Sequence, residues 1–389
     1  MRGRRFWIAA AALAAAACAA PPSAPPMVGV KLYLNQANLQ ARYPDYDALV
    51  GELRAGGLNA LFTTLYEGRT AFYASDILPN RDPAIDLKRL RDSAARQDVR
   101  FGAICHIFYD ADTLATRPDL VPVDQHGDNT FVNWQRLVCP SDEAYRQYKL
   151  SIVKEIASTI RPDVISLDFM RFPTTWEIVP PDTSPERIRN FCFDDRCLTR
   201  FQREYSVTIP DDRETVSSKA EWILANHNDD WVKWKTGLIT SFVEEASRAV
   251  RQIDPDIKVS IHVVPWSEST FANALLWNAG QDVTAIAAHV DYVSPMIYHK
   301  LIGHPKEYIG SFTKELADKS HKDILPSIQV AEILDEGEVP AEEFRESLAL
   351  ALQPPSSGTL IFQWGDLRPD ENASALRREK QDIVRAATR

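Results

Sequence analysis

The chain has 389 residues, a formal net charge of −10 at pH 7, and 45% hydrophobic and 25% charged residues. This composition is ordinary for a globular protein, and the length allows one large domain or two to three smaller ones. The acidic balance argues against nucleic acid as a partner and against adsorption on anionic lipid, because phosphate binding requires clustered lysine and arginine.

Residues 1–18 are predicted to be a targeting signal with a lipobox. Three arginines precede an apolar run over residues 6–17, which is too short to cross a membrane as a helix. The run ends in alanines before Cys18, as in a bacterial lipobox, so Cys18 is expected to be the lipidated first residue. Ordinary signal-peptidase cleavage is the alternative. The proline-rich residues 19–27 would form a tether, and the protein would be held by its lipid at the membrane, in the periplasm or at the outer membrane.

Export implies an oxidising compartment, in which the cysteines beyond the signal can form disulfides. Cys192 and Cys197 are close in sequence and fall in one loop, so a local disulfide between them is predicted. Cys105 and Cys139 would form a second bridge or remain free thiols. The sequence contains no CxxC or HxH spacing, so we expect neither a metal site nor a cofactor.

Short β-rich runs alternate along the chain with longer amphipathic stretches. Eight such units predict a single α/β domain over residues 28–389, a (β/α)8 TIM barrel. The β-rich runs cover residues 28–35, 58–66, 99–108, 164–169, 259–264, 292–298, 324–330 and 359–364. The helical stretches cover residues 46–55, 87–97, 142–160, 230–253, 272–289, 305–319, 341–352 and 372–387.

The longest connection of this barrel follows its fourth strand, over about residues 173–228. It contains Cys192, Cys197 and a short helical stretch over residues 198–205. Loops after barrel strands lie at the C-terminal face, where barrel enzymes have their active sites. The insertion is therefore expected to form a lid or a wall of a binding site.

Asp168 ends the apolar fourth strand and is the first candidate for a catalytic residue. Ile165 and Leu167 alternate there with Ser166 and Asp168, so the carboxylate belongs to the set of side chains that faces the barrel interior. The structural alternative is a buried aspartate paired with Arg171.

Cleavage of a glycosidic bond requires two carboxyl groups, one protonated and one ionised, about 5 Å apart in retaining enzymes and about 6.5–9.5 Å apart in inverting ones. Glu268, just beyond the fifth strand, is the preferred partner of Asp168. The other candidates in loops after strands are Glu67, Asp110, Glu177 and Glu332.

Aromatic side chains at the same face are candidates for stacking on sugar rings, although packing in the core is the alternative. Trp364, at the end of the eighth strand, is the preferred one, and Trp134 and Trp176 lie near the same face. The predicted substrate-binding residues are Arg171, Tyr66, His262, Trp266, Tyr298, Gln329 and Trp364.

Several segments resemble predicted glycoside hydrolases of the glycosyl-hydrolase family 10-like group. Residues 163–173 read DVISLDFMRFP, which is similar to DGIHFDYIRYP in that family. The resemblance implies a TIM barrel, a carbohydrate substrate, and a match of Asp168 to the strand-four aspartate. The chain departs from the family at Phe169-Met170, and Asn190-Phe191 stands where some relatives have a further cysteine. The other similar segments are residues 71–75, 117–120, 124–127, 139–141, 145–148, 192–201 and 249–260.

The sequence therefore favours a glycoside hydrolase (EC 3.2.1.-) that cleaves a polysaccharide or other glycan through a carboxylate pair including Asp168. The alternative is a non-catalytic carbohydrate-binding lipoprotein with the same fold, which would need no second carboxylate beside Asp168. A metal-dependent hydrolase or deacetylase is a third reading, because His106, His262 and His299 fall on or near strands.

Overall fold

A computed structural model describes residues 25–33, 45–80, 85–131, 134–368 and 373–388. The predicted signal and the predicted lipidation site, Cys18, lie outside these ranges. Within them, no helix combines the length and apolar character needed to cross a membrane.

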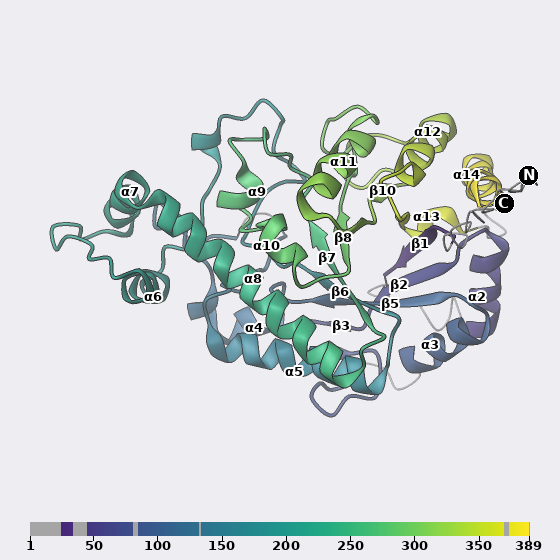
Figure 1. The fold of residues 1–389 in the computed structure, drawn as a ribbon, viewed down its shortest axis with the longest axis horizontal. Helices are drawn as coiled ribbons and strands as arrows, with labels where there is room; N and C mark the ends of the chain where they lie inside the picture. The colour runs from purple at the N-terminus through teal and green to yellow at the C-terminus, as the bar shows by residue number, and fades with distance from the viewer. Residues whose placement is uncertain (1–24, 34–44, 81–84, 132–133, 369–372, 389) are drawn as a thin grey trace, which may run out of the picture.

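The described residues form one large, curled, parallel sheet with helices packed around it (Figure 1). Its strand order is β10-β11-β1-β2-β5-β6-β7-β8-β9. β9 and β10 stand at the two ends of this order but only Leu325 and Pro326 separate them in the chain, and a bridge joins Met296, just after β8, to Ser327 in β10. The sheet therefore curves back on itself. The strands are β1 (Met27–Leu32), β2 (Ala60–Thr64), β5 (Arg100–His106), β6 (Val164–Asp168), β7 (Lys258–Val263), β8 (Tyr292–Pro295), β9 (Asp323–Ile324), β10 (Ser327–Gln329) and β11 (Gly358–Phe362).

Each of the eight predicted β-rich runs contains a strand of this sheet, and the seventh is divided into β9 and β10. Pro326 lies at the break, and proline lacks the backbone N–H that a parallel ladder uses. A separate two-stranded hairpin, β3 (Tyr66–Glu67) with β4 (Thr70–Ala71), follows β2 and was not predicted.

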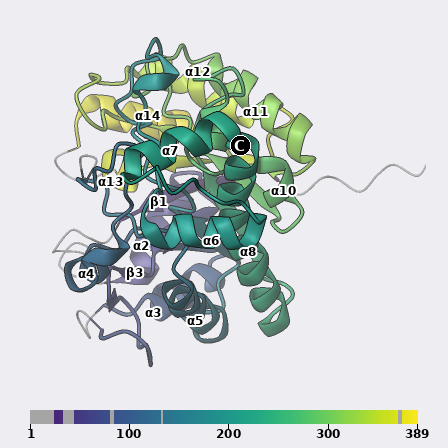
Figure 2. The same cartoon turned by 90° about the vertical axis from the view of Figure 1, so that its left-hand side faces the viewer.

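Helices surround the sheet (Figures 1 and 2). Most of the α-helices begin at a side chain that accepts a hydrogen bond from the backbone of the first turn. Asp45, Asp86 and Asp142 cap three of them in this way. Among the longer helices are α2 (Tyr46–Ala55), α3 (Leu87–Arg96), α5 (Glu143–Thr159), α8 (Asn228–Ile253), α11 (Tyr308–Ser320), α12 (Ala341–Leu352) and α14 (Ala375–Ala387). The shorter ones include α4 (Ala111–Thr116) and α13 (Trp364–Leu367).

The helix expected over residues 272–289 is wrong as a single element. The chain forms two short helices there, α9 (Ala274–Trp277) and α10 (Val283–Ala287). Gly280 lies between them with a φ of 76°, a left-handed conformation that interrupts a right-handed helix.

Between β6 and α8 the chain forms α6 (Asp195–Tyr205) and α7 (Val216–Asn226), which project at one end of the molecule in Figure 1. Aromatic rings join this extension to the N-terminal part of α8. Trp231 is fully buried, with its ring centroid 4.7 Å from that of Phe193 and 4.9 Å from that of Phe201. Such packing fixes the extension to the rest of the fold.

The interior of the curled sheet changes character along the strands. A small apolar cluster that includes Met27, Phe62 and Val164 fills the interior near the N-terminal ends of the strands. Gly102 makes room for it, because a Cβ there would lie 2.2 Å from the Phe62 ring. Toward the carboxyl ends the inward positions become polar, as in the series Val164, Ser166, Asp168 on β6. The polar residues of the interior thus collect at the C-terminal face.

Candidate active site

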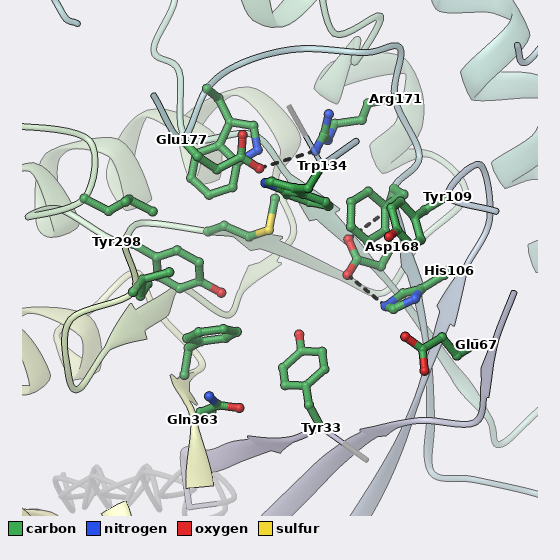
Figure 3. A pocket seen from close by; sticks show the side chains of 16 residues that line it. Tyr33, Glu67, His106, Tyr109, Trp134, Asp168, Arg171, Glu177, Tyr298 and Gln363 are labelled. Atoms are coloured by element: carbon green, nitrogen blue, oxygen red, sulfur yellow. Dashed lines mark hydrogen bonds and ion pairs between the residues drawn. The ribbon is translucent and has the colours of Figure 1, made fainter. Parts of the chain in front are cut away.

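A cavity of about 390 Å³ opens at the carboxyl ends of the strands (Figure 3). His106 and Asp168 are the last residues of β5 and β6 and lie opposite each other in the parallel register. Tyr33 follows β1 directly, and Phe362 ends β11. The ends of β1, β5, β6 and β11 therefore contribute to one cavity. Its acidic lining residues are Glu67, Asp168 and Glu177.

Asp168 is 6% exposed and is held by its own backbone. Its Oδ1 accepts the N–H of Phe169 at 2.7 Å, and its Oδ2 lies 3.9 Å from Nε2 of His106. Phe169 has a φ of 53°, a conformation that costs a non-glycine residue about 1–2 kcal/mol. Its ring stacks on Tyr109, with centroids 4.9 Å apart. Packing thus stabilises the turn that directs the carboxylate into the cavity.

Asp168 remains ionised although it is buried. Burial favours its neutral form, but attraction to the protonated forms of His262 and His106, attraction to Lys31 and the Phe169 N–H outweigh it and lower the pKa below 3.8. Burial itself lowers the pKa of His106 to about 4 and that of His262 to about 3, so both rings are neutral at pH 7. Lys31 is then the remaining charge partner, with a pKa that burial lowers to about 8 against the pull of Asp168.

Glu177 has the opposite electrostatic character. Burial raises its pKa to about 7, a shift that Arg171 opposes and that the charge of Asp168 reinforces. Nη2 of Arg171 lies 3.6 Å from Oε1 of Glu177, and Nε2 of Gln135 donates to Oε2 at 3.2 Å. Glu177 therefore holds a proton for a substantial fraction of the time at neutral pH.

Aromatic rings form much of the cavity wall. Phe362 contacts Tyr33 and Tyr298, with ring centroids 5.5 and 5.1 Å apart. Trp176 continues this wall beyond Tyr298, at 6.0 Å. On the other side Trp134 lies against Tyr109 and is 37% exposed. Flat rings of this kind pack on the C–H faces of sugars and leave the hydroxyl groups free for polar contacts.

The structure brings together part of the predicted site. Asp168, Arg171 and Tyr298 line the cavity. His262 lies beneath it, fully buried, with Nε2 3.2 Å from Oγ of Ser166. These residues remain candidates for contact with, or support of, a bound substrate.

Glu268 is not brought together with Asp168. Its side chain is 66% exposed, pairs with Lys319 at 3.1 Å, and is not among the residues that line the cavity. Trp266 lines a different, smaller cavity, which shares only Trp176 with the first. The loop after β7 turns outward, and this explains why both residues miss the cavity although they follow a strand end.

Three further candidates are fully buried and do not line the cavity. The hydroxyl of Tyr66 donates to the carbonyl of His106 at 2.6 Å. The amide oxygen of Gln329 accepts two backbone N–H groups, from Lys300 and Leu301. Trp364 is fully buried, and its neighbour Gln363 lines the cavity instead. Of the other acids considered, Asp110 and Glu332 do not line the cavity either.

The predicted disulfide between Cys192 and Cys197 is wrong. Cys192 is bonded to Cys139, 53 residues away, whereas Cys197 and Cys105 are free thiols. Cys197 lies in the first turn of α6, and Cys192 follows Phe191, which forms a bridge with Asp124. Proximity in sequence was therefore a poor guide to pairing.

Sequence reasoning did not select Lys31, Tyr33 or His106 as site residues. The sequence did contain an indication for Lys31 and Tyr33. They occupy successive inward-facing positions of the first predicted strand, and no apolar inward-facing residue separates them. A lysine that faces a barrel interior is buried only where a charge or a cavity accommodates it.

The arrangement matches known proteins in family and fold. A family model described as "Putative glycosyl hydrolase domain" matches residues 66–315. No curated protein matches the chain in sequence. The PgaB (BpsB) glycoside hydrolase domain from Bordetella bronchiseptica has a TM-score of 0.67 at 12% identity, covering 92% of this chain and 99% of that one.

Two larger proteins share the fold. Gan42B, a GH42 β-galactosidase from G. stearothermophilus, has a TM-score of 0.66 at 13% identity, over 94% of this chain and 56% of that one. Alpha-L-fucosidase isoenzyme 2 from Paenibacillus thiaminolyticus has a TM-score of 0.60 at 12% identity, over 93% and 49%. The chain thus spans about half the length of these two proteins, and at such identities the likeness concerns the fold alone.

Proposed function

The chain belongs to the glycosyl hydrolase domain family matched over residues 66–315, and from this premise we propose that it is a glycoside hydrolase of class EC 3.2.1.-. Its substrate is a polysaccharide or oligosaccharide, and its carboxylate pair is Asp168 and Glu177. Glu177 replaces Glu268 as the partner, because it lines the same cavity as Asp168.

One observation carries this proposal: two acids in one aromatic-walled cavity have pKa values displaced in opposite directions. Asp168 is ionised well below neutrality, and Glu177 keeps its proton up to about pH 7. Glycoside hydrolysis requires this division of roles, since one carboxyl group donates a proton while the other acts in its ionised form. Binding of a glycan without cleavage would not require it.

The chemistry then follows from the two environments. Glu177 donates its proton to the oxygen of the departing sugar, and the departure leaves positive charge on the remaining ring. Asp168 either attacks the anomeric carbon or removes a proton from a water that does so, and the separation of the two carboxyl groups decides between these routes. Lys31 keeps Asp168 ionised, and Arg171 limits the rise in the pKa of Glu177.

The wider architecture is part of the proposal. We count β9 and β10 as one interrupted strand, which makes residues 28–389 a (β/α)8 barrel with an insertion over about residues 173–228 that carries Glu177. A lipid on Cys18 would hold this barrel at the bacterial cell envelope, where glycans are accessible.

The proposal is tested with Glu177→Gln on two glycosides of the same sugar, one with an alkyl and one with a nitrophenyl leaving group. We expect turnover of the alkyl glycoside to fall by about 10²–10⁴-fold, the contribution of a general acid. The nitrophenyl glycoside needs little protonation to depart, so its loss should be much smaller. Asp168→Asn should lose turnover on both.

Equal losses of Glu177→Gln on the two substrates would show that Glu177 is not the proton donor. The same experiment with Glu67→Gln then provides a matched comparison, because Glu67 lines the same cavity. Wild-type turnover by Asp168→Asn would remove the hydrolase proposal altogether.

A further inference from the structure

Four side chains with metal-binding atoms gather in the segment that leads into α6. Cys139, Cys192, Asp194 and Cys197 each place one sulfur or carboxylate oxygen within 4.8 Å of all the others. All three cysteines are fully buried. None of the four lines the cavity that contains Asp168, so the cluster has a role separate from the proposed hydrolysis.

The cluster holds one more cysteine than a disulfide can use. Cys139 and Cys192 are bonded, and Sγ of the free Cys197 lies 3.3 Å from Sγ of Cys139. We propose that, when this disulfide is reduced, the three thiolates and the Asp194 carboxylate bind one zinc ion. The disulfide is then the oxidised, metal-free form of the same site.

The distances suit a tetrahedral site. Zinc–sulfur bonds of about 2.3 Å place the sulfurs of a tetrahedron about 3.8 Å apart. The 3.3 Å between Cys139 and Cys197, and the 4.8 Å limit for the whole set, bracket this value. Small adjustments of side-chain rotamers therefore suffice to surround an ion, and four protein ligands make a closed site, as in structural rather than catalytic zinc centres.

Asp194 is already oriented as a ligand. Its Oδ1 accepts the N–H of Cys197 at 3.1 Å and lies 3.6 Å from Nη2 of Arg196. Its Oδ2 faces Sγ of Cys192 at 3.2 Å. One oxygen is thus fixed by the N-terminus of α6, which leaves the other directed at the sulfurs. Metal-binding carboxylates are commonly oriented by hydrogen bonds of this kind.

Charge and protons balance in the proposed binding step. Zn²⁺ displaces three protons from the three thiols, which leaves a site of net charge −2, the same as in a four-cysteine zinc site. Two neighbours reduce the cost of this charge. Arg196 approaches Asp194, and Oγ of Ser141 lies 3.2 Å from Sγ of Cys139 and 3.1 Å from that of Cys197.

The ion would join three separate segments of the chain. Cys139 precedes α5, Cys192 follows the bridge between Asp124 and Phe191, and Asp194 with Cys197 begins α6. The extension that carries α6 would therefore be fixed to the body of the fold in the reduced chain, as the disulfide fixes it in the oxidised one.

The test is the zinc content of the full chain after reduction with a phosphine, incubation with zinc and removal of excess metal. We expect about one zinc per chain, as a four-ligand site predicts. Substitution with Co²⁺ should give the thiolate charge-transfer and tetrahedral ligand-field absorption bands. Cys197→Ser should abolish both signals, because it removes one of the three thiolates. Cys105→Ser should retain both, because Cys105 is buried outside the cluster.

Asp194→Asn provides a second test in case the Cys197→Ser variant misfolds. Asparagine still caps α6 but is a poor zinc ligand, so zinc affinity should fall at least about 100-fold, the upper range for loss of an outer-shell partner. Reduced wild-type chain without stoichiometric zinc would overturn the proposal. So would a Cys197→Ser chain that holds as much zinc as the wild type.

Discussion

Two buried aspartates in this molecule each have a lysine in their surroundings, yet only one lies in a candidate active site. Asp110 and Lys149 are both fully buried, 3.1 Å apart. Asp110 also accepts the Thr113 N–H at 2.9 Å and lies 3.3 Å from the Tyr145 hydroxyl. Asp168 has one short hydrogen bond, from its neighbour's backbone, and lines a cavity. Burial of an aspartate near a lysine therefore does not identify a candidate active site. A buried carboxylate does so when it lines a cavity and its oxygen atoms can accept further hydrogen bonds.

The largest effect that tests this comparison is the loss of turnover in Asp168→Asn. The amide preserves shape but cannot act as nucleophile or base, so kcat should fall at least about 1000-fold. The free energy of unfolding should fall less than in Asp110→Asn, because Lys31 acts on Asp168 over a longer distance than the 3.1 Å that joins Lys149 to Asp110. An activity assay measures kcat, and urea unfolding measures the free energy of unfolding. A large loss of stability with little loss of turnover would contradict the comparison between Asp168 and Asp110.

Asp110→Asn should show the opposite pattern. It leaves Lys149 buried without its charge partner, which costs about 3–5 kcal/mol in free energy of unfolding. The molecules that remain folded should keep their kcat. The matched control is Asp110→Asn combined with Lys149→Met, which removes both charges and should recover most of the stability. If the double variant is as unstable as the single one, the pair is not the cause.

The two histidines near Asp168 should make stability depend on pH. In the unfolded chain they bind protons with a pKa near 6.5, but burial lowers the pKa to about 4 for His106 and about 3 for His262. The stability they contribute is complete above pH 6.5 and is lost as the pH falls toward 4. Between pH 7 and 5 the loss should be about 2 kcal/mol for each histidine.

Urea unfolding at the two pH values measures this slope. His262→Gln should reduce the loss by about 2 kcal/mol, whereas His321→Gln, on an exposed histidine, should leave it unchanged. An unchanged slope in His262→Gln would mean that this ring is charged in the folded chain, and Lys31 would then not be the remaining charge partner of Asp168 at pH 7.

The smallest effect is expected at Glu268, the acid that the sequence favoured. Its exposed side chain pairs with Lys319, and exposed ion pairs contribute about 0–1 kcal/mol. Glu268→Gln should change kcat/KM less than about twofold. A drop comparable to that of Glu177→Gln, measured on the same alkyl glycoside, would return Glu268 to the active site.

The strands were predictable because β-rich runs bounded by polar segments reflect burial on both faces, a local property of the sequence. The position of Asp168 was predictable for a related reason. Alternation of inward-facing and outward-facing residues along a single strand is enough to place it last in the inward-facing set. The break at Gly280 and the split at Pro326 could have been read from the residue types that cause them.

The partner of Asp168 could not be chosen in the same way. Glu177 and Glu268 both follow strand ends, and only the fold shows that one loop turns over the cavity while the other turns outward. The cysteine pairing failed for a similar reason, because Cys139 and Cys192 are 53 residues apart and only the fold brings them together. Tyr66 and Gln329 were chosen by position, but their hydrogen-bonding groups already have partners within the protein.

The cavity wall is assembled from separate connections. Tyr33 follows β1, Glu67 follows β2, Tyr109 follows β5 and Gln363 follows β11, while Asp168 is fixed by the strand below them. Each wall can therefore vary through mutation or insertion in one loop, without disturbing Asp168 or the other walls. Such modularity allows the range of ligands that the cavity accepts to evolve one loop at a time, and it allows hybrids in which a single exchanged connection changes specificity.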